Sequence, residues 1–306
     1  MLYFALAVAF TVALYLIMRA YPRYRINSFH AVVFNYYSCV LTGLALTSDL
    51  AVFQKIEWLS QGTLLTLSLG LMFVTAFMLI GLTAQKVSVT ATSLAGNMSL
   101  VIPVLFGLFI FKNNNKDFTV LNYAGLVLAL VALALGAIQT KDKSKSADQS
   151  VLGALWLFPV LTFLASGTNN TLINFLSVKY YEPGQTTVFM IIACTGAVII
   201  GTSILIYRIF AYKEKLLFRS VIGGLILGVP NFLSLYYLLL ALASFGNSAA
   251  FVFPIYNILT MLVSSAAAWL IYREKLNNSN KWGLVLAVIA ILLISYQELG
   301  FFTNNV

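Results

Sequence analysis

The residues of this chain that could do chemistry are neutral amides and hydroxyls at helical spacing. Thr90, Ser93 and Asn97 follow one another at steps of three and four inside an apolar run, which would place them on one face of a helix. A later apolar run repeats the pattern with Asn257, Thr260 and Ser264. Such groups hydrogen-bond a polar solute, but they do not exchange a proton near neutral pH. The pattern therefore indicates binding rather than catalysis.

Further polar side chains in other apolar runs extend the expected binding site. These candidates are Asn170, Asn174, Asn231 and Tyr237. Polar groups inside a bilayer cost free energy unless they are paired or hydrated, so they are candidates for a translocation path. The alternative interpretation is that they hydrogen-bond between helices and hold the bundle together. Both interpretations stay open for each residue.

The ionisable residues argue against an enzyme and against a metal site. All nine Asp and Glu residues lie in expected loops or at helix ends, and the chain has no HExxH and no Asp-rich motif. His30 is the single histidine and has no cysteine or second histidine beside it to complete a metal site. Cys39 and Cys194 lie in apolar runs, where a thiol behaves as a small hydrophobe. We expect no metal, no cofactor and no disulfide.

The elements that must position these residues are membrane-spanning helices. The 306 residues are 61% hydrophobic and 9% charged, with a mean hydropathy of +0.93. Segments of roughly 17 to 25 apolar residues can cross a bilayer as helices. Ten such segments are expected, at 1–18, 29–47, 61–84, 88–111, 118–138, 151–177, 184–207, 219–242, 247–272 and 282–297. Pro103 and Pro254 lie inside two of them and should kink them, as hinges or as fixed shape.

The distribution of basic residues predicts how the chain lies in the membrane. The net charge is +9, and 14 of the 18 Lys and Arg residues fall in the loops that follow the odd-numbered helices. Cytoplasmic loops carry such an excess, so we expect these loops inside and both termini outside the cell (inner) membrane. The charge is thereby explained without a nucleic-acid partner.

A repeated stretch divides the chain into two halves. NYAGLVLALVAL at 122–133 matches NKWGLVLAVIAI at 280–291 in seven of twelve positions. We expect a first five-helix repeat at 1–140, a cytoplasmic linker at 141–150 and a second repeat at 151–306. Since five is odd, the second repeat enters the membrane inverted, an architecture typical of secondary transporters. Asn97 and Asn257 then fall within one residue of equivalence, which favours them as substrate-binding residues.

Small residues in the repeated stretch predict close helix packing. Gly125 and Ala129 lie four apart, as do Gly283 and Ala287, so each pair occupies one helix face. Such faces let backbones approach closely. We expect the two helices to pack within their own half, or against a second copy of the chain in a homodimer.

The chain resembles the EamA-type ten-helix members of the drug/metabolite transporter superfamily. The resemblance rests on the two five-helix repeats and on YREKL (272–276) followed by NKWGLVLAVIAILL (280–293). It implies a structural or gating role for Glu274, which closes the fourth helix of the second repeat. The first repeat departs from the pattern, with FKNNNK (111–116) placing Asn113 or Asn114 where the Glu would stand. Relatives such as nucleotide-sugar carriers have both termini in the cytosol, in conflict with the charge count.

The expected function is therefore transport of a small solute. A pocket of neutral amides and hydroxyls suits a polar or zwitterionic metabolite, such as an amino acid, moved by alternating access through facilitated diffusion or exchange. The first helix has no Glu, unlike the small multidrug members of the superfamily, which argues against proton antiport of hydrophobic cations. The alternative within the same fold is a carrier of lipid or lipid-linked cargo.

Overall fold

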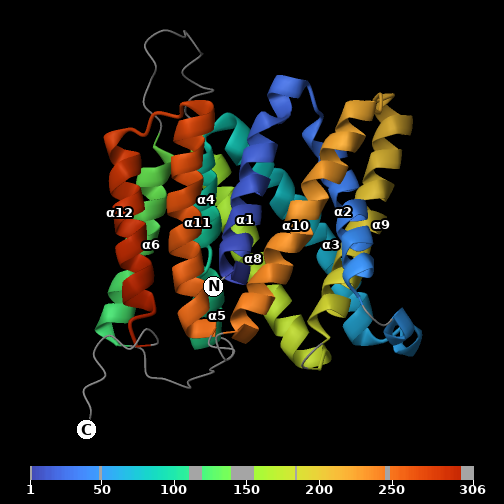
Figure 1. The fold of residues 1–306 in the computed structure, drawn as a ribbon, viewed down its shortest axis with the longest axis horizontal. Coiled ribbons are helices and arrows are strands. Elements are labelled where there is room, and N and C mark those ends of the chain that lie inside the picture. Colours follow the sequence, from blue (N-terminus) through green and yellow to red (C-terminus); the bar gives the residue numbers. More distant parts are fainter. Residues whose placement is uncertain are drawn as a thin grey trace.

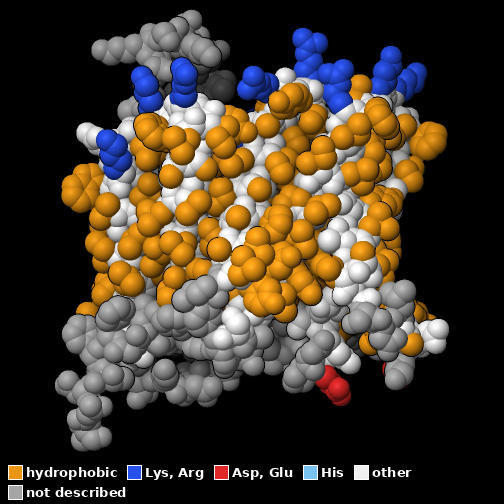
Figure 2. All heavy atoms as spheres, viewed as in Figure 1, with side chains coloured by type: hydrophobic (Ala, Val, Ile, Leu, Met, Phe, Trp, Pro, Cys, Tyr) orange, Lys and Arg blue, Asp and Glu red, His pale blue; other side chains and the backbone are white. Residues whose placement is uncertain are grey.

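The structure is a computed structural model that describes residues 2–47, 50–109, 119–138, 155–182, 185–244 and 249–297. Within these ranges every regular element is a helix, and there is no strand. The helices lie side by side in one bundle (Figure 1). Exposed apolar side chains form a broad band across the middle of the face that Figure 2 shows.

The helices fall into two series along the chain. The first series is α1 (Leu2–Ala20), α2 (Ser28–Leu46), α3 (Gln61–Lys86), α4 (Val89–Met98), α5 (Val101–Phe109) and α6 (Val120–Ala137), with short 3-10 helices η1 (Tyr21–Tyr24) and η2 (Leu50–Lys55). The second series is α8 (Leu157–Tyr180), α9 (Thr186–Tyr212), α10 (Phe218–Ser244), α11 (Ala249–Tyr272) and α12 (Asn278–Ile294).

The length and apolarity of these helices make the chain a multi-pass membrane protein. Six stretches meet the length and hydropathy of a membrane span, and they correspond to α1, α2, α3, α9, α10 and α11. The apolar stretches of α6 and α12 are shorter. The prediction of an all-helical membrane protein is thereby confirmed, and the count of ten spans stays a prediction.

The expected helix 88–111 is interrupted. It forms α4 and α5, which are separated by Ser99 and Leu100. Pro103 has no N–H to donate to Ser99 O, and that carbonyl accepts instead from Ile102 N at 3.0 Å, in a tighter turn. Pro254 behaves differently, because α11 continues through it.

Basic side chains gather at one end of the bundle (Figure 2). The basic end is where α1, α3, α9 and α11 end and α10 and α12 begin. These helix ends and the loops that join them carry Arg19, Arg23, Arg25, Lys86, Arg208, Lys213, Lys215, Arg219, Arg273, Lys275 and Lys281. Hydrogen bonds tie its helix ends together. The Arg19 guanidinium donates to Ala84 O at 2.8 Å and also to Gln85 O. That this end faces the cytoplasm stays a prediction.

The two series are interleaved rather than stacked as separate bundles. The most extensive contacts are those of α2 with α10, α6 with α12, and α3 with α9. One buried apolar cluster is built mainly from α1, α2, α3, α9 and α10, and a second mainly from α4, α6, α11 and α12. Each series therefore buries its apolar faces against the other.

Glycines allow two of these helix pairs to cross at backbone contact. A side chain at Gly70 of α3 would strike the backbone of Gly196 and Ala197 in α9. A side chain at Gly228 of α10 would likewise strike the backbone of α2 at Asn35. Small residues are what such close crossings require.

The repeated stretch forms the contact between α6 and α12. Gly125 faces Ala290 and Ile294 of α12, and Gly283 faces Ala132 and Gly136 of α6. Ala129 and Ala287 are fully buried. The small faces thus meet each other across the two halves of one chain, so the expectation that each packs within its own half was wrong. The homodimer through these helices stays a prediction, and it would have to use their opposite, apolar faces.

Each of these two helices also has an asparagine that binds the far end of its partner. Asn122 Nδ2 donates to Ile294 O at 2.8 Å and to Leu293 O at 3.4 Å. Equivalent bonds form at the other end of the helix pair, where Asn280 Nδ2 donates to Gly136 O at 2.9 Å and to Leu135 O at 3.3 Å. These amides satisfy C-terminal carbonyls that have no partner within their own helix.

We expect Asn122→Ala and Asn280→Ala each to destabilise the protein by about 1 kcal/mol or more, because each removes the paired bonds to the partner helix. Each also removes further bonds: those that Asn122 Oδ1 accepts from Thr119 N and Oγ1, and the one that Asn280 Nδ2 donates to Ile138 O. The measurement is the apparent melting temperature of the purified protein in detergent. Asn278→Ala is the control, since Asn278 is exposed at the start of α12. A loss confined to one of the two variants would contradict the equivalence of the contacts.

Candidate functional site

The polar residues predicted on two separate runs meet along one line, the polar seam. It consists of Thr90, Ser93 and Asn97 on α4 and Asn257, Thr260 and Ser264 on α11. The two helices run antiparallel in contact, and Ser93 Oγ donates to Thr260 O at 3.5 Å. Because the helices run antiparallel, Asn97 and Asn257 lie on the same side of this bond, four and three residues from it along their helices.

All six side chains of the polar seam are buried. Asn97 Nδ2 donates within its own helix, to Ser93 O at 2.7 Å. The hydroxyl oxygens of Thr90 and Thr260 are buried without a hydrogen-bond partner in the described chain. A buried hydroxyl without a partner is costly, so the seam calls for water or a polar ligand.

Two residues of α1 extend the seam, and the sequence interpretation missed them. Thr11 Oγ1 and Tyr256 Oη, next to Asn257, share a hydrogen bond of 2.5 Å. Tyr15 is buried beside α4, where a side chain at Gly96 would lie 3.1 Å from the tyrosine oxygen. The available signal was the four-residue step from Thr11 to Tyr15, which puts both on one face of α1.

Tyr237 lies at the edge of this region. Its ring stacks on Phe10 of α1, with centroids 5.7 Å apart, and on Tyr3 at 6.1 Å. It belongs to the same small apolar cluster as Tyr256. The ring of Tyr237 therefore packs against α1.

The amides predicted on α8 are separated from the polar seam. Asn170 Nδ2 donates to Ser99 Oγ at 3.5 Å, just beyond the end of α4. Both Asn170 and Asn174 are exposed. Of this stripe, only Asn170 is hydrogen-bonded to the segment that carries the seam.

Asn231 belongs to a different cluster, between α2 and α10. Its Nδ2 donates to Asn35 Oδ1 at 3.1 Å and lies 3.4 Å from Cys39 Sγ. Here the structure favours the packing interpretation, because the amide joins α2 and α10, and the seam residues are on α4 and α11.

Glu274 binds the start of α4. Its carboxylate accepts from Val89 N at 3.2 Å and from Thr90 N at 3.4 Å. A carboxylate at a helix N-terminus is stabilised by unpaired N–H groups and by the helix dipole. Glu274 thus fastens the end of α11 to the start of α4 at the basic end, next to the seam. Asn113 and Asn114, expected at the equivalent place in the first half, lie outside the described residues.

A second cluster of charges lies at the basic end, around Glu214. This carboxylate accepts from Arg208 Nε at 2.7 Å and from Asn27 Nδ2 at 2.8 Å. His30 Nε2 lies 3.2 Å from Glu214 Oε1. The histidine is thus engaged with a carboxylate that joins α2 to the loop between α9 and α10. In the described parts of the chain, no group of three His, Cys, Asp or Glu side chains could hold a metal ion.

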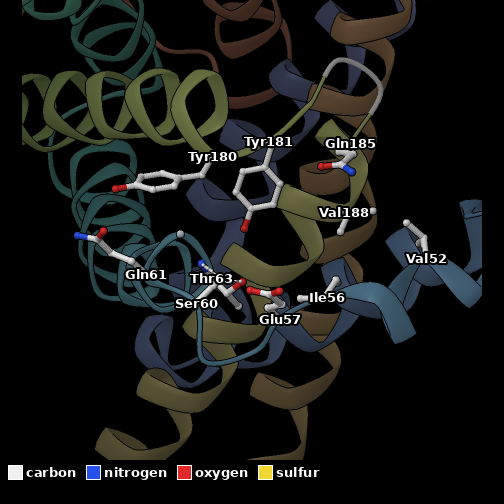
Figure 3. Close-up of a pocket in the computed structure, with 11 residues that line it drawn as sticks. Val52, Ile56, Glu57, Ser60, Gln61, Thr63, Tyr180, Tyr181, Gln185 and Val188 are labelled. Carbon is white, nitrogen blue, oxygen red and sulfur yellow. Dashed lines mark hydrogen bonds between the residues drawn. The ribbon is translucent and has the colours of Figure 1, made fainter.

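A cavity of about 380 Å³ opens at the end of the bundle opposite the basic end (Figure 3). Val52, Ile56 and Glu57, with the start of α3 at Ser60 to Thr63, form one wall, and Tyr180, Tyr181, Gln185 and Val188 form the other. We call it the Glu57 cavity. Its polar lining includes Glu57, Ser60, Thr63, Tyr181 and Gln185. The sequence interpretation placed no site here.

Comparisons with known proteins bear on the fold. No family model matches the sequence. A protein of Haemophilus influenzae described as uncharacterized is 23% identical over 298 residues, which cover 95% of this chain and 97% of that protein. A solved structure, described only as a crystal structure of a protein, is 13% identical with a TM-score of 0.57 and covers 99% of this chain and 98% of that one. The chain shares a fold with that structure. At this level of identity, the likeness extends to the fold alone.

Proposed function

We propose that the chain is a secondary transporter of the EamA type. It moves a small polar or zwitterionic metabolite by alternating access, through facilitated diffusion or exchange. The observation that carries the proposal is the polar seam, in which six buried amide and hydroxyl residues from two halves of the chain face each other at a helix crossing. Buried polar groups at the interface of two repeats are typical of transporter substrate sites.

The contacts between α6 and α12 support an inverted repeat. Gly125 and Gly283 are 158 positions apart, and so are their partners, since Ala132 and Gly136 correspond to Ala290 and Ile294. The bonds of Asn122 and Asn280 follow the same offset at both ends. Contacts that map onto each other in an antiparallel pair are what a twofold axis in the membrane plane produces.

The crossings at Gly70 and Gly228 support the same axis. These glycines are also 158 positions apart, and their partner positions, Gly196 and Ser38, differ by 158 as well. The contact of α3 with α9 is therefore the counterpart of the contact of α10 with α2. These symmetric contacts support the proposal that the chain has the architecture of the EamA-type transporters.

The state of the two ends fits one conformation of an alternating-access cycle. The basic end is fastened by Glu274, Glu214 and Arg19, each of which joins helices of the bundle there. The Glu57 cavity lies at the other end. We infer a conformation closed at the basic end, in which a solute would reach the polar seam from the opposite side.

The test is counterflow in liposomes. The purified protein is reconstituted, preloaded with a mixture of metabolites, and exchange is followed by mass spectrometry. We expect a polar solute to exchange with the wild type and the rate to fall at least tenfold in the Asn97→Ala/Asn257→Ala variant, because two substrate hydrogen bonds are lost. Asn278→Ala serves as the matched control and should transport normally. Exchange indifferent to the double substitution would overturn the assignment of the seam.

A carrier of lipid-linked cargo is the second candidate, favoured by one observation. Asn170 and Asn174 are exposed on the surface of α8, where a polar headgroup could reach them from the side. In the same liposomes, movement of a fluorescent lipid between leaflets, lost in Asn170→Ala/Asn174→Ala, would select this function.

A further inference from the structure

One side of α1 leads from the polar seam to the basic end. α1 runs through the middle of the bundle, in contact with α3, α4, α10 and α11 (Figure 1). Thr11, Tyr15 and Arg19 follow one another at steps of four, so they lie on one side of this helix, each about 6 Å further along it. Thr11 and Tyr15 extend the polar seam, as described above. Arg19 is therefore the charged end of a polar stripe that starts at the seam.

The charge of Arg19 meets only neutral partners in the described chain. Both ion pairs found there involve Glu214. The Arg19 guanidinium instead donates from a single nitrogen, Nη1, to Ala84 O and Gln85 O at the end of α3. Arg19 is partly buried, whereas Arg23 is exposed. A guanidinium has five N–H donors, so this one keeps both donors and charge for an anion.

The packing shared by the two halves does not require a cation at this place. An offset of 158 positions relates the contacts of the two halves, as for Asn122 and Asn280, and it relates Arg19 to Ser177 of α8. The Ser177 hydroxyl donates within its own helix, to Asn174 O at 3.1 Å. An exposed cation would serve the membrane topology equally well. The partly buried guanidinium therefore has a use of its own in the first half.

The present contact of Arg19 belongs to the closed basic end. Gln85 Nε2 donates to Met18 O at 3.0 Å, and the Tyr272 hydroxyl donates to Leu16 O at 2.6 Å, so α1 is held against α3 and α11 there. Opening this end would separate α1 from α3 and release the guanidinium. A carboxylate then accepts two parallel, charge-assisted bonds, which are stronger than bonds to neutral carbonyls. The negative end of the α3 dipole disfavours an anion beside those carbonyls, so the carboxylate and the closed contact compete for Arg19.

We propose that Arg19 binds the carboxylate of the transported solute when the basic end is open. Closure returns the guanidinium to the carbonyls of α3 and releases the solute to the polar seam, one helical turn away at Tyr15. One guanidinium neutralises one negative charge, which a carboxylate carries and a phosphate dianion exceeds. The inference rests on the proposed function and gives its substrate class, a small metabolite with a carboxylate.

The test is the apparent melting temperature of the full chain in detergent, titrated with the standard L-amino acids, lactate and succinate and with the amide of each. We expect at least one carboxylate to stabilise the wild type saturably and its amide to bind at least tenfold more weakly. Arg19→Gln should weaken binding of that carboxylate about tenfold and remove the discrimination against its amide. Arg19→Lys keeps the charge without the paired bonds and should lie between the two. Arg23→Gln removes an exposed arginine close in sequence, so it is the matched control and should bind as the wild type.

Equal affinity for a carboxylate and its amide, no saturable stabilisation by any carboxylate tested, or equal losses in Arg19→Gln and Arg23→Gln would each overturn the inference. The proposed function fails by a different result. Carboxylate binding that needs Arg19, without counterflow in liposomes, would keep the binding site and remove the transporter. Counterflow that is indifferent to Arg19→Gln would keep the transporter and remove the carboxylate site.

Discussion

Replacing Gly70 or Gly196 with valine is expected to prevent α3 and α9 from packing together. A Cβ at either position would overlap the backbone of the other helix, and backbone atoms cannot turn aside as a flexible side chain can. The helices would have to separate, and the buried side chains around the crossing, including Leu69 and Ala197, would lose contact. Overpacking of this kind costs about 3 kcal/mol or more.

The measurement is the yield of monodisperse protein from the membrane, together with the apparent melting temperature of whatever is recovered. Gly81→Ala is the control on the same helix, since its Cβ would lie 3.5 Å from the nearest atom of Met18, an ordinary contact. We expect that variant to behave as the wild type. Normal yield and melting of Gly70→Val would mean that the two helices do not cross this closely.

Replacing Glu274 with alanine is expected to loosen the basic end. The change leaves Val89 N and Thr90 N without their carboxylate partner and releases the end of α11 from the start of α4. α4 keeps its N-cap Ser88, but loss of the bonds to a charged carboxylate costs about 1.5 kcal/mol, which corresponds to a roughly tenfold change in a conformational equilibrium. Glu274→Gln keeps a carbonyl acceptor but not the charge, so its effect should be smaller.

Labelling of a cysteine checks this expectation. Thr90→Cys is placed in a Cys39→Ser/Cys194→Ser background and treated with an impermeant maleimide from the basic end. Thr90 is buried, so labelling should be slow while Glu274 is present. We expect labelling about tenfold faster with Glu274→Ala. Identical labelling rates with Glu274 and with Glu274→Ala would show that Glu274 does not help to close this end.

Sequence patterns predicted the elements of this fold better than their partners. The expected segment 61–84 became Gln61–Lys86, and 247–272 became Ala249–Tyr272. The stripes of α4 and α11 could also be predicted, because polar residues at helical spacing stand out in an apolar run. The pairing of α3 with α9 could not. A largely apolar helix has no periodic pattern that identifies its neighbour. The pairing depends instead on Gly70 and Gly196, where the two backbones approach closely.

The break at Ser99 and the Glu57 cavity were missed for other reasons. Pro103 predicted a kink, but sequence alone does not say whether a proline interrupts a helix. The helix is interrupted before Pro103, whereas α11 continues through Pro254. The sequence analysis placed Glu57 among the loop carboxylates, and the structure does place it in a loop, between η2 and α3. Its cavity forms where Ile56, Glu57 and the start of α3 meet Tyr180, Tyr181 and Gln185, and no local pattern predicts a contact between segments so far apart in the sequence.

The interleaving of the two series has a consequence for how the chain is made. Ribosomes add about 5–20 residues per second, so the 141 positions from the end of α6 at Ala137 to the start of α12 at Asn278 take about 7–28 seconds. Throughout that interval Asn122 and the glycine face of α6 are in the membrane without the helix that they bind. α2 and α3 are likewise in the membrane before their packing partners, α10 and α9, have been synthesised. Lipids or the insertion machinery must therefore cover the unpaired helix faces of the incomplete protein, because the first helices complete their packing only after the last helices have been inserted.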